Sequence, residues 1–172
     1  LQKQKKAAEE AERIWESAEL AESDHPYLVR KGVKSYGLKK VKYDGLEVLL
    51  VPLVDEFGKI WSFQRIYPDQ RRADKILLKN GRTTGLYFTI GDLSIQRVVC
   101  EGYATGASIH AATGYCVHVA FSSGNLREVA QTIRKLHSDV DLFIAADDDY
   151  KTESNPGLTK ATEACRSSKA KI

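Results

Sequence analysis

The spacing of apolar residues divides the chain into three parts with different expected structures. Between Gln2 and Ala21, apolar residues recur at helical spacing with lysine and glutamate between them, which predicts an amphipathic helix. Pro26 and Gly32 then predict the start and the end of a short helix. We expect residues 1–24 to form a linker or packing helix ahead of the folded subdomains.

Between residues 25 and 95, short β-rich runs alternate with turn residues. Asp44-Gly45 and Asn80-Gly81 predict tight turns. Pro52, which lies inside one of the runs, indicates an edge strand or a bulge. The strands predicted in this region include residues 46–54, 59–67 and 84–89. This region is therefore expected to be a smaller, mostly antiparallel α+β subdomain.

From residue 96 onward, the pattern becomes a regular alternation of strand and helix. The predicted strands are residues 96–100, 115–121 and 141–146, and the predicted helices are residues 104–112, 126–137 and 156–168. Right-handed crossovers would make this part a small parallel sheet with helices on both faces. We expect an α/β domain over residues 96–172.

Composition indicates a soluble globular protein. Hydrophobic residues make up 42% of the 172 residues, which is enough for a substantial core. The three widely spaced cysteines support neither a disulfide framework nor a zinc ribbon, so a cytoplasmic protein is expected. No apolar run approaches membrane-spanning length. The chain contains no methionine, which suggests a piece of a longer protein.

The net charge of +3 conceals two oppositely charged segments. Residues 59–82 contain seven basic side chains and two acids, whereas residues 139–153 contain six acids and one lysine. We expect the first segment to attract phosphates and the second to attract cations.

Acidic residues follow two of the predicted parallel strands. Glu101-Gly102 comes directly after residues 96–100, and Asp147, Asp148 and Asp149 follow residues 141–146. The carboxyl ends of parallel strands in open α/β sheets face the ligand crevice, so these acids are expected to meet there. Oxygen ligands of this kind suit Mg²⁺ or Mn²⁺. A solvated acidic loop is the alternative for the aspartates.

The other polar candidates are expected to have structural roles. His110, His118 and His137 fall in predicted helix or strand interiors, without the mutual spacing of a metal site or a triad. The segment 122–125 lies between a strand and a helix, which favours a helix cap.

The acidic motifs resemble those of a known family. Glu101-Gly102 together with Asp147-x-Asp149 is similar to the Toprim domain of bacterial-type primases, topoisomerases and certain nucleases. The segment 101–106, E-G-Y-A-T-G, closely resembles the E-G-Y-A-T-A signature of TraC-type plasmid primases and alpha-type phage primases, with Gly106 in place of the last alanine. Upstream, the segments 25–28 and 51–53 resemble the primase region that precedes Toprim, so the likeness covers residues 25–168.

The resemblance implies roles for individual residues. It makes Glu101 the catalytic acid and, with Asp147 and Asp149, a metal ligand. Three basic residues would hold template and nucleotide phosphates: Arg65, Lys75 and, with a looser match, Lys79. DnaG-type enzymes have a further aspartate where this chain has Thr105, and they carry an acidic motif beyond Toprim that is absent here.

The resemblance implies a DNA primase catalytic core, a DNA-directed RNA polymerase that makes short primers by two-metal nucleotidyl transfer. Its partners would be single-stranded DNA, ribonucleoside triphosphates and a fused or separate replicative helicase, and no membrane is expected. Two alternatives stay open: a Toprim-type metal-dependent nuclease, and a non-catalytic module that binds DNA or a helicase.

Overall fold

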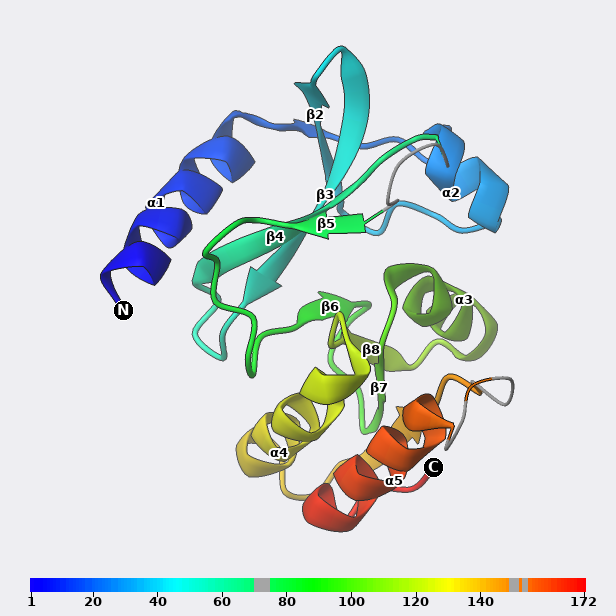
Figure 1. Cartoon of the computed structure of the whole chain (residues 1–172). Helices are drawn as coiled ribbons and strands as arrows, with labels where there is room; N and C mark the ends of the chain where they lie inside the picture. Colours follow the sequence, from blue (N-terminus) through cyan, green and yellow to red (C-terminus); the bar gives the residue numbers. More distant parts are fainter. Residues whose placement is uncertain (70–74, 149–151, 153–154) are drawn as a thin grey trace. The chain divides into compact units, whose positions relative to one another are not determined.

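The computed structural model describes residues 1–69, 75–148, 152 and 155–172. These residues form two compact units, residues 1–83 and residues 84–172. Figure 1 follows the chain through both units, from blue at the N-terminus to red at the C-terminus. Each unit has a sheet and a core of its own, and each is described by itself.

The first unit is built on a five-stranded sheet whose strands follow one another in chain order, β1-β2-β3-β4-β5. All of its pairings are antiparallel, as the turn-rich sequence predicted. The elements of this unit are α1 (Gln2–Ser17), β1 (Glu19–Leu20), α2 (Pro26–Lys31), β2 (Lys39–Tyr43), β3 (Leu46–Val54), β4 (Ile60–Ile66) and β5 (Lys75–Leu77).

Helix α1 closes the core of the first unit. Its small residues Ala7 and Ala11 are buried against Leu50 of β3, Phe63 of β4 and Leu78. Alanine has no side chain beyond Cβ, so the helix can lie close to the large side chains of the sheet. The amphipathic pattern therefore predicted a packing helix correctly, although the helix ends at Ser17 and the short strand β1 follows it.

Pro52 lies in β3, which is a central strand of the sheet and not an edge strand. The last β3 residue that pairs with β2 is Leu50, so Pro52 lies beyond that ladder and its missing N–H breaks no bond to β2. A register shift occurs between Leu53 and Val54, opposite β4. Pro52 itself pairs in register with Phe63, so the bulge lies next to it, and β3 is unpaired on its β2 side at this position.

The second unit contains a four-stranded sheet in the order β6-β8-β7-β9. The central strand β7 is parallel to both β8 and β9, as the β-α alternation predicted. Strand β6 is antiparallel to β8, so the strand predicted at residues 84–89 belongs to this sheet and not to the first one. The elements are β6 (Phe88–Ile90), β7 (Gln96–Cys100), α3 (Tyr103–Thr113), β8 (Cys116–Val119), the 3₁₀ helix η1 (Ser123–Asn125), α4 (Leu126–Leu136), β9 (Asp141–Ala145) and α5 (Pro156–Ser168).

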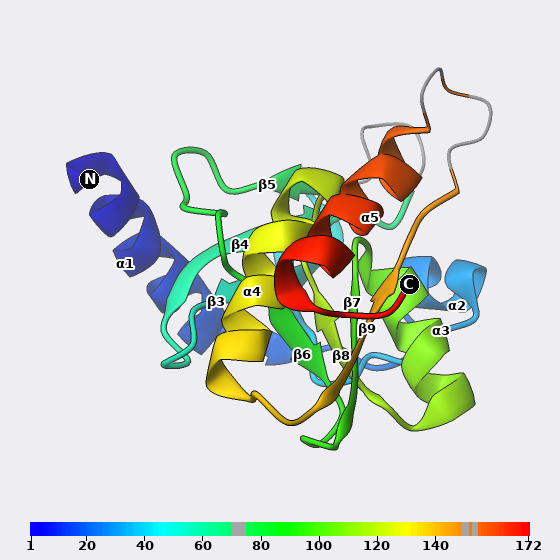
Figure 2. The same ribbon diagram turned by 90° about the horizontal axis from the view of Figure 1, so that it is seen from below.

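Helices cover both faces of the second sheet. Helices α4 and α5 lie side by side over one face, where Val129, Ile133 and Ala161 pack with the strand residues Val99 and Ile144. Helix α3 covers the other face (Figure 2). Alternating residues of β7 and β8 point to opposite faces, so each strand contributes to both layers. This is the α/β architecture expected for residues 96–172.

The described residues contain three free cysteines and no helix that is both long and apolar enough to cross a membrane. Cys100 and Cys116 are buried in the second unit, and Cys165 is partly exposed on α5. Packing and hydrogen bonds therefore hold the described part of each unit together without a disulfide.

Candidate active site

Strand β7 ends at Cys100, and Glu101 follows at the carboxyl edge of the sheet. Two backbone hydrogen bonds fix this point, because Ala120 N–H donates to Cys100 O and Phe121 N–H donates to Glu101 O, each at 2.8 Å. Gly102 is the N-cap of α3, and Tyr103 begins the helix with a fully buried side chain. The Glu101 backbone is therefore held between a strand end and an anchored helix, with its side chain half-buried.

Strand β9 delivers the second acidic residue to the same edge. Cys100 of β7 pairs in register with Ala145 of β9, so Glu101 directly follows one of the two paired strand ends and Asp147 lies two residues after the other. Neighbouring strands lie about 4.8 Å apart. Asp147 is half-buried, like Glu101, whereas Asp148 is exposed.

The charges of both carboxylates affect the pKa of the Cys100 thiol. Burial, followed by the negative charges of Asp147 and Glu101, raises the pKa of Cys100 to about 12. Both carboxylates therefore act on one buried sulfur at the end of β7. With so high a pKa, Cys100 stays a protonated packing residue and is no candidate nucleophile.

The loop after β9 is tied to the start of α5. Asn155 Nδ2 donates to Asp148 Oδ1 at 2.8 Å, and Asn155 Oδ1 accepts from Leu158 N–H at 3.4 Å as the cap of α5. Asp149, the third predicted metal ligand, lies outside the described residues. Within the described part of the chain, no three histidine, cysteine or acidic side chains form a metal-binding cluster.

The predicted phosphate-binding residues lie in the first unit. Arg65 on β4 pairs with Leu50 and Ile76, whereas Lys75 on β5 pairs with Ile66. Because side chains alternate along a strand, Arg65 and Lys75 point to opposite faces of the sheet. Lys79 is exposed in the turn after β5. The structure therefore does not bring Arg65 and Lys75 onto one face.

Arg65 lies among aromatic rings. Its guanidinium carbon is 4.3 Å from the centroid of the Tyr43 ring and 5.3 Å from that of Phe63. No described residue forms a hydrogen bond or an ion pair with this guanidinium. Tyr43 was not among the predicted site residues, although it lies at the end of a lysine-rich strand and beside a turn.

His118 is a structural residue of the second sheet, as its position in a strand predicted. Burial, followed by the nearby Arg97 and His137 charges, lowers the pKa of His118 to about 3. Its Nδ1 lies 3.0 Å from Thr89 Oγ1, and its Nε2 lies 3.7 Å from Cys116 Sγ. The neutral imidazole is therefore held inside the core.

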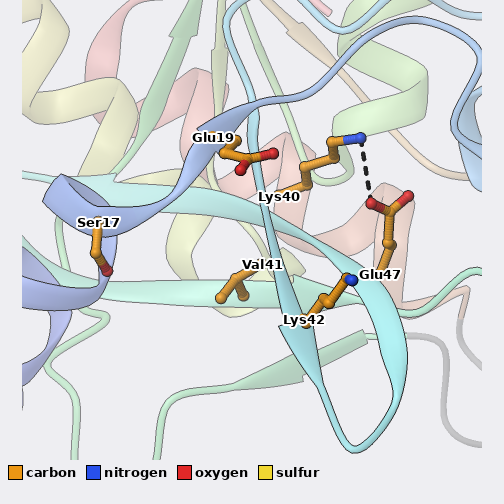
Figure 3. Close-up of a pocket in the computed structure, with 6 residues that line it drawn as sticks. All are labelled: Ser17, Glu19, Lys40, Val41, Lys42 and Glu47. Atoms are coloured by element: carbon orange, nitrogen blue, oxygen red, sulfur yellow. Dashed lines mark ion pairs between the residues drawn. The ribbon is translucent and has the colours of Figure 1, made fainter.

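The first unit also contains an open hollow of about 270 Å³, shown in Figure 3. Lys40 and Glu47 form an ion pair of 3.2 Å at its wall. The hollow is lined by Ser17, Glu19, Lys40, Val41, Lys42 and Glu47. Its mixed charges and its lack of any predicted site residue leave the acidic edge of the second sheet as the better candidate for chemistry.

Comparison with known proteins shows similarity at the level of domain, sequence and fold. Residues 96–172 match the family model described as the Toprim domain. The chain is 33% identical over 150 residues to a DNA primase TraC of Escherichia coli, a match that covers 82% of this chain. The same match covers 14% of the TraC sequence, so the chain corresponds to a small part of that relative.

Solved primase structures share the fold. The DnaG primase catalytic domain bound to single-stranded DNA has a TM-score of 0.63 and 10% identity, over 95% of this chain and 67% of that chain. The primase fragment of the bacteriophage T7 primase-helicase protein has a TM-score of 0.57 and 14% identity, over 81% of this chain and 59% of that chain. Together with the Toprim match, these likenesses confirm the resemblance and the fold class that the sequence predicted.

Proposed function

We propose that this chain, whose residues 96–172 belong to the Toprim domain family, is the catalytic core of a DNA primase. Such a core is a nucleotidyltransferase that makes short RNA primers on single-stranded DNA. The observation that supports the proposal is the position of Glu101 and Asp147 just after the ends of adjacent parallel strands in that domain.

The oxygen atoms at this edge suit a hard divalent cation. Two half-buried carboxylates repel each other unless a cation neutralises them, and Mg²⁺ or Mn²⁺ is the natural partner for such oxygens. We propose that Glu101 and Asp147 hold the metal together with Asp149. When bound, the metal would lower the pKa of the attacking 3′-hydroxyl and neutralise charge on the transferred phosphate.

The side chains of the protein would hold and orient the reactants. Glu101, fixed between β7 and α3, is placed to be a metal ligand, a general base, or both. Arg65, Lys75 and Lys79 would contact phosphates of the template strand and the nucleotide, with little sequence preference and with strong salt dependence. Because Arg65 and Lys75 point to opposite faces of β4 and β5, we expect them to contact different phosphates.

The proposed partners are a single-stranded DNA template and ribonucleoside triphosphates. One solved neighbour is a DnaG domain bound to single-stranded DNA, and another comes from a primase-helicase protein. These relatives support a DNA template for this chain and a replicative helicase as a fused or separate partner.

The test is primer synthesis from labelled ribonucleotides on single-stranded DNA with Mg²⁺ or Mn²⁺. Glu101→Gln and Asp147→Asn should each reduce synthesis at least about a hundredfold, because each removes a charged metal ligand. The matched control is Asp141→Asn, at the opposite end of β9, where the exposed acid pairs with Lys171 at 3.7 Å. That control should keep activity within about twofold of the wild type. Wild-type rates in Glu101→Gln would refute the assignment.

A parallel incubation without nucleotides separates the alternatives. Shortening of the DNA under these conditions would indicate a Toprim nuclease, whereas nucleotide-dependent products would indicate a primase. A module that only binds DNA or a helicase would give neither result. Calorimetric titration with Mn²⁺ would show no binding if the chain is such a module. If the chain is an enzyme, the titration would show binding, and Asp147→Asn would weaken it.

A further inference from the structure

Arg65 has an unusual environment for a half-buried cation. The Tyr43 ring lies below its guanidinium at 4.3 Å, and Phe63 lies at 5.3 Å. No carboxylate, carbonyl or hydroxyl of a described residue accepts a hydrogen bond from it. An arginine whose contacts within the described part of the chain are with ring faces keeps its N–H donors available there, because a ring face attracts the cation without using those donors.

The Tyr43 ring is itself held in place on one side. It meets the buried Tyr67 ring edge to face, with centroids 6.4 Å apart and planes at 76°. Tyr43 remains 44% exposed, so it is not a core residue whose loss would collapse the unit. The ring thus forms a fixed and accessible support at the end of the β2–β3 hairpin.

The strand register shows that Arg65 and Tyr43 are not cross-strand neighbours. Tyr43 pairs with Leu46, whereas Arg65 pairs with Leu50, so the arginine side chain runs along the sheet to reach the ring. Ordering a long arginine side chain over that span loses rotamer entropy. An exposed contact between one cation and one ring stabilises a fold only slightly, so its main effect is to fix where the guanidinium lies.

We propose that Tyr43 is a positioning residue, which holds the Arg65 guanidinium so that its N–H donors bind a phosphate oxygen of a nucleic-acid strand or of an incoming nucleotide. This inference rests on the proposed function for the use of the phosphate, but the binding can be measured without primer synthesis. Arginine suits the task because its planar fork matches two phosphate oxygens at once.

The test uses the 172-residue chain and a fluorescein-labelled oligothymidylate, with anisotropy measured at several salt concentrations. Tyr43→Leu should weaken binding about three- to tenfold, the size of one lost cation–ring contact. It should also reduce the slope of log affinity against log salt by about 0.7, the value for one lost contact to a single strand. Tyr43→Phe keeps the ring and should stay within about twofold of the wild type.

Two further variants show whether Tyr43 acts through Arg65. In the Tyr43→Leu/Arg65→Ala double variant, binding should be no weaker than in Arg65→Ala, because the ring has nothing left to position. Additive losses would overturn the proposal, since Tyr43 would then contact the ligand by itself. Lys42 comes immediately before Tyr43 in β2 and is exposed. Lys42→Ala therefore controls for the loss of one positive charge near the ring. Its effect should be smaller than that of Tyr43→Leu.

A second arm identifies the source of the phosphate. The KM for ribonucleoside triphosphates is measured in the same variants at saturating DNA. A raised KM with unchanged DNA binding would place the phosphate on the nucleotide, and the reverse would place it on the strand. Unchanged values in both arms would overturn the proposal. If the wild type binds DNA but makes no primer, the proposed function fails while the positioning role of Tyr43 stands or falls on the binding data.

Discussion

Gly106 lies in the interior of α3, at the one position where the chain departs from the E-G-Y-A-T-A signature that it resembles. The backbone there is helical, so the glycine is not needed for its conformational freedom. A Cβ atom at this position would lie 3.0 Å from Cys100 Sγ, 3.1 Å from Val119 Cγ2 and 3.2 Å from Val117 Cγ1. The small residue therefore fits the close approach of α3 to β7 and β8.

We expect Gly106→Ala to be close to neutral or destabilising by about 1 kcal/mol, although alanine in a helix is normally favoured over glycine by about that amount. The crowding should depend on the Cys100 sulfur. The Gly106→Ala/Cys100→Ala double variant should therefore be more stable than the sum of the two single changes by about 0.5–1 kcal/mol. Urea unfolding of the four proteins measures this coupling, and strict additivity would show that the sulfur is not what limits the space.

Residues also differ in how far their roles could be predicted from sequence. The positions of Glu101 and Asp147 near strand ends could be predicted because each follows an apolar run typical of a buried strand, and parallel strands have their carboxyl ends at one edge. Their roles as metal ligands stay a prediction. The contact between Asn155 and Asp148 could not be predicted, because it depends on the path of a loop. Tyr43 and Arg65 are far apart in sequence, and only the strand register relates them.

At the scale of elements, the C-terminal ends of α4 and α5 are joined by a single side chain. Arg134 donates to the carbonyl oxygens of Ser138 and Val140 at 2.8 Å, to that of Ser168 at 2.9 Å and to that of Lys169 at 3.3 Å. Helix C-termini carry unsatisfied carbonyl groups and partial negative charge. One guanidinium on α4 thus binds carbonyl groups of the loop after α4 and of the end of α5.

Arg134→Ala should lower the free energy of unfolding by about 2–3 kcal/mol, because several charge-assisted hydrogen bonds are lost together. Arg134→Lys keeps the charge but not the planar fork, so it should fall between the alanine variant and the wild type. Arg127→Ala, an exposed position on the same helix, should change stability by less than about 0.5 kcal/mol. Equal effects in Arg134→Ala and Arg127→Ala would contradict the linking role.

The local sequence pattern predicted whether a segment is a helix or a strand, but it did not predict which strands pair with one another. The residues of β6 alternate in a way that indicates a strand, yet three residues do not specify which sheet they will join, and β6 pairs with β8. The faces of Arg65 and Lys75 were likewise not predictable from a count of basic residues. They depend on the register between β4 and β5, which turns and side-chain packing fix.

At the scale of the whole molecule, the candidate acidic residues and the candidate basic residues belong to different sheets, each with its own core. The second unit presents carboxylates at one strand edge, whereas the predicted phosphate-binding residues belong to the first unit. The separation of basic from acidic residues could be predicted from the sequence, because the two kinds of charge fall in separate segments, each with its own hydrophobic periodicity. The sequence could not predict where the first unit ends, because residues 84–89 read as one more strand of the antiparallel region.

The stability of the second unit should fall in acid through His118. The pKa of His118 is about 3 in the folded protein, against about 6.5 in an unfolded chain, so the unfolded state binds more protons between these values. Stability is therefore fully present above about pH 6.5 and is lost progressively as the pH falls toward 3. From pH 7 to pH 4 the loss should be about 3 kcal/mol from this group.

In His118→Gln that contribution is absent, while the other titratable groups are unchanged. Urea unfolding at both pH values should thus show a smaller acid loss in the variant, and an equal loss would mean that the buried imidazole is not what resists the proton.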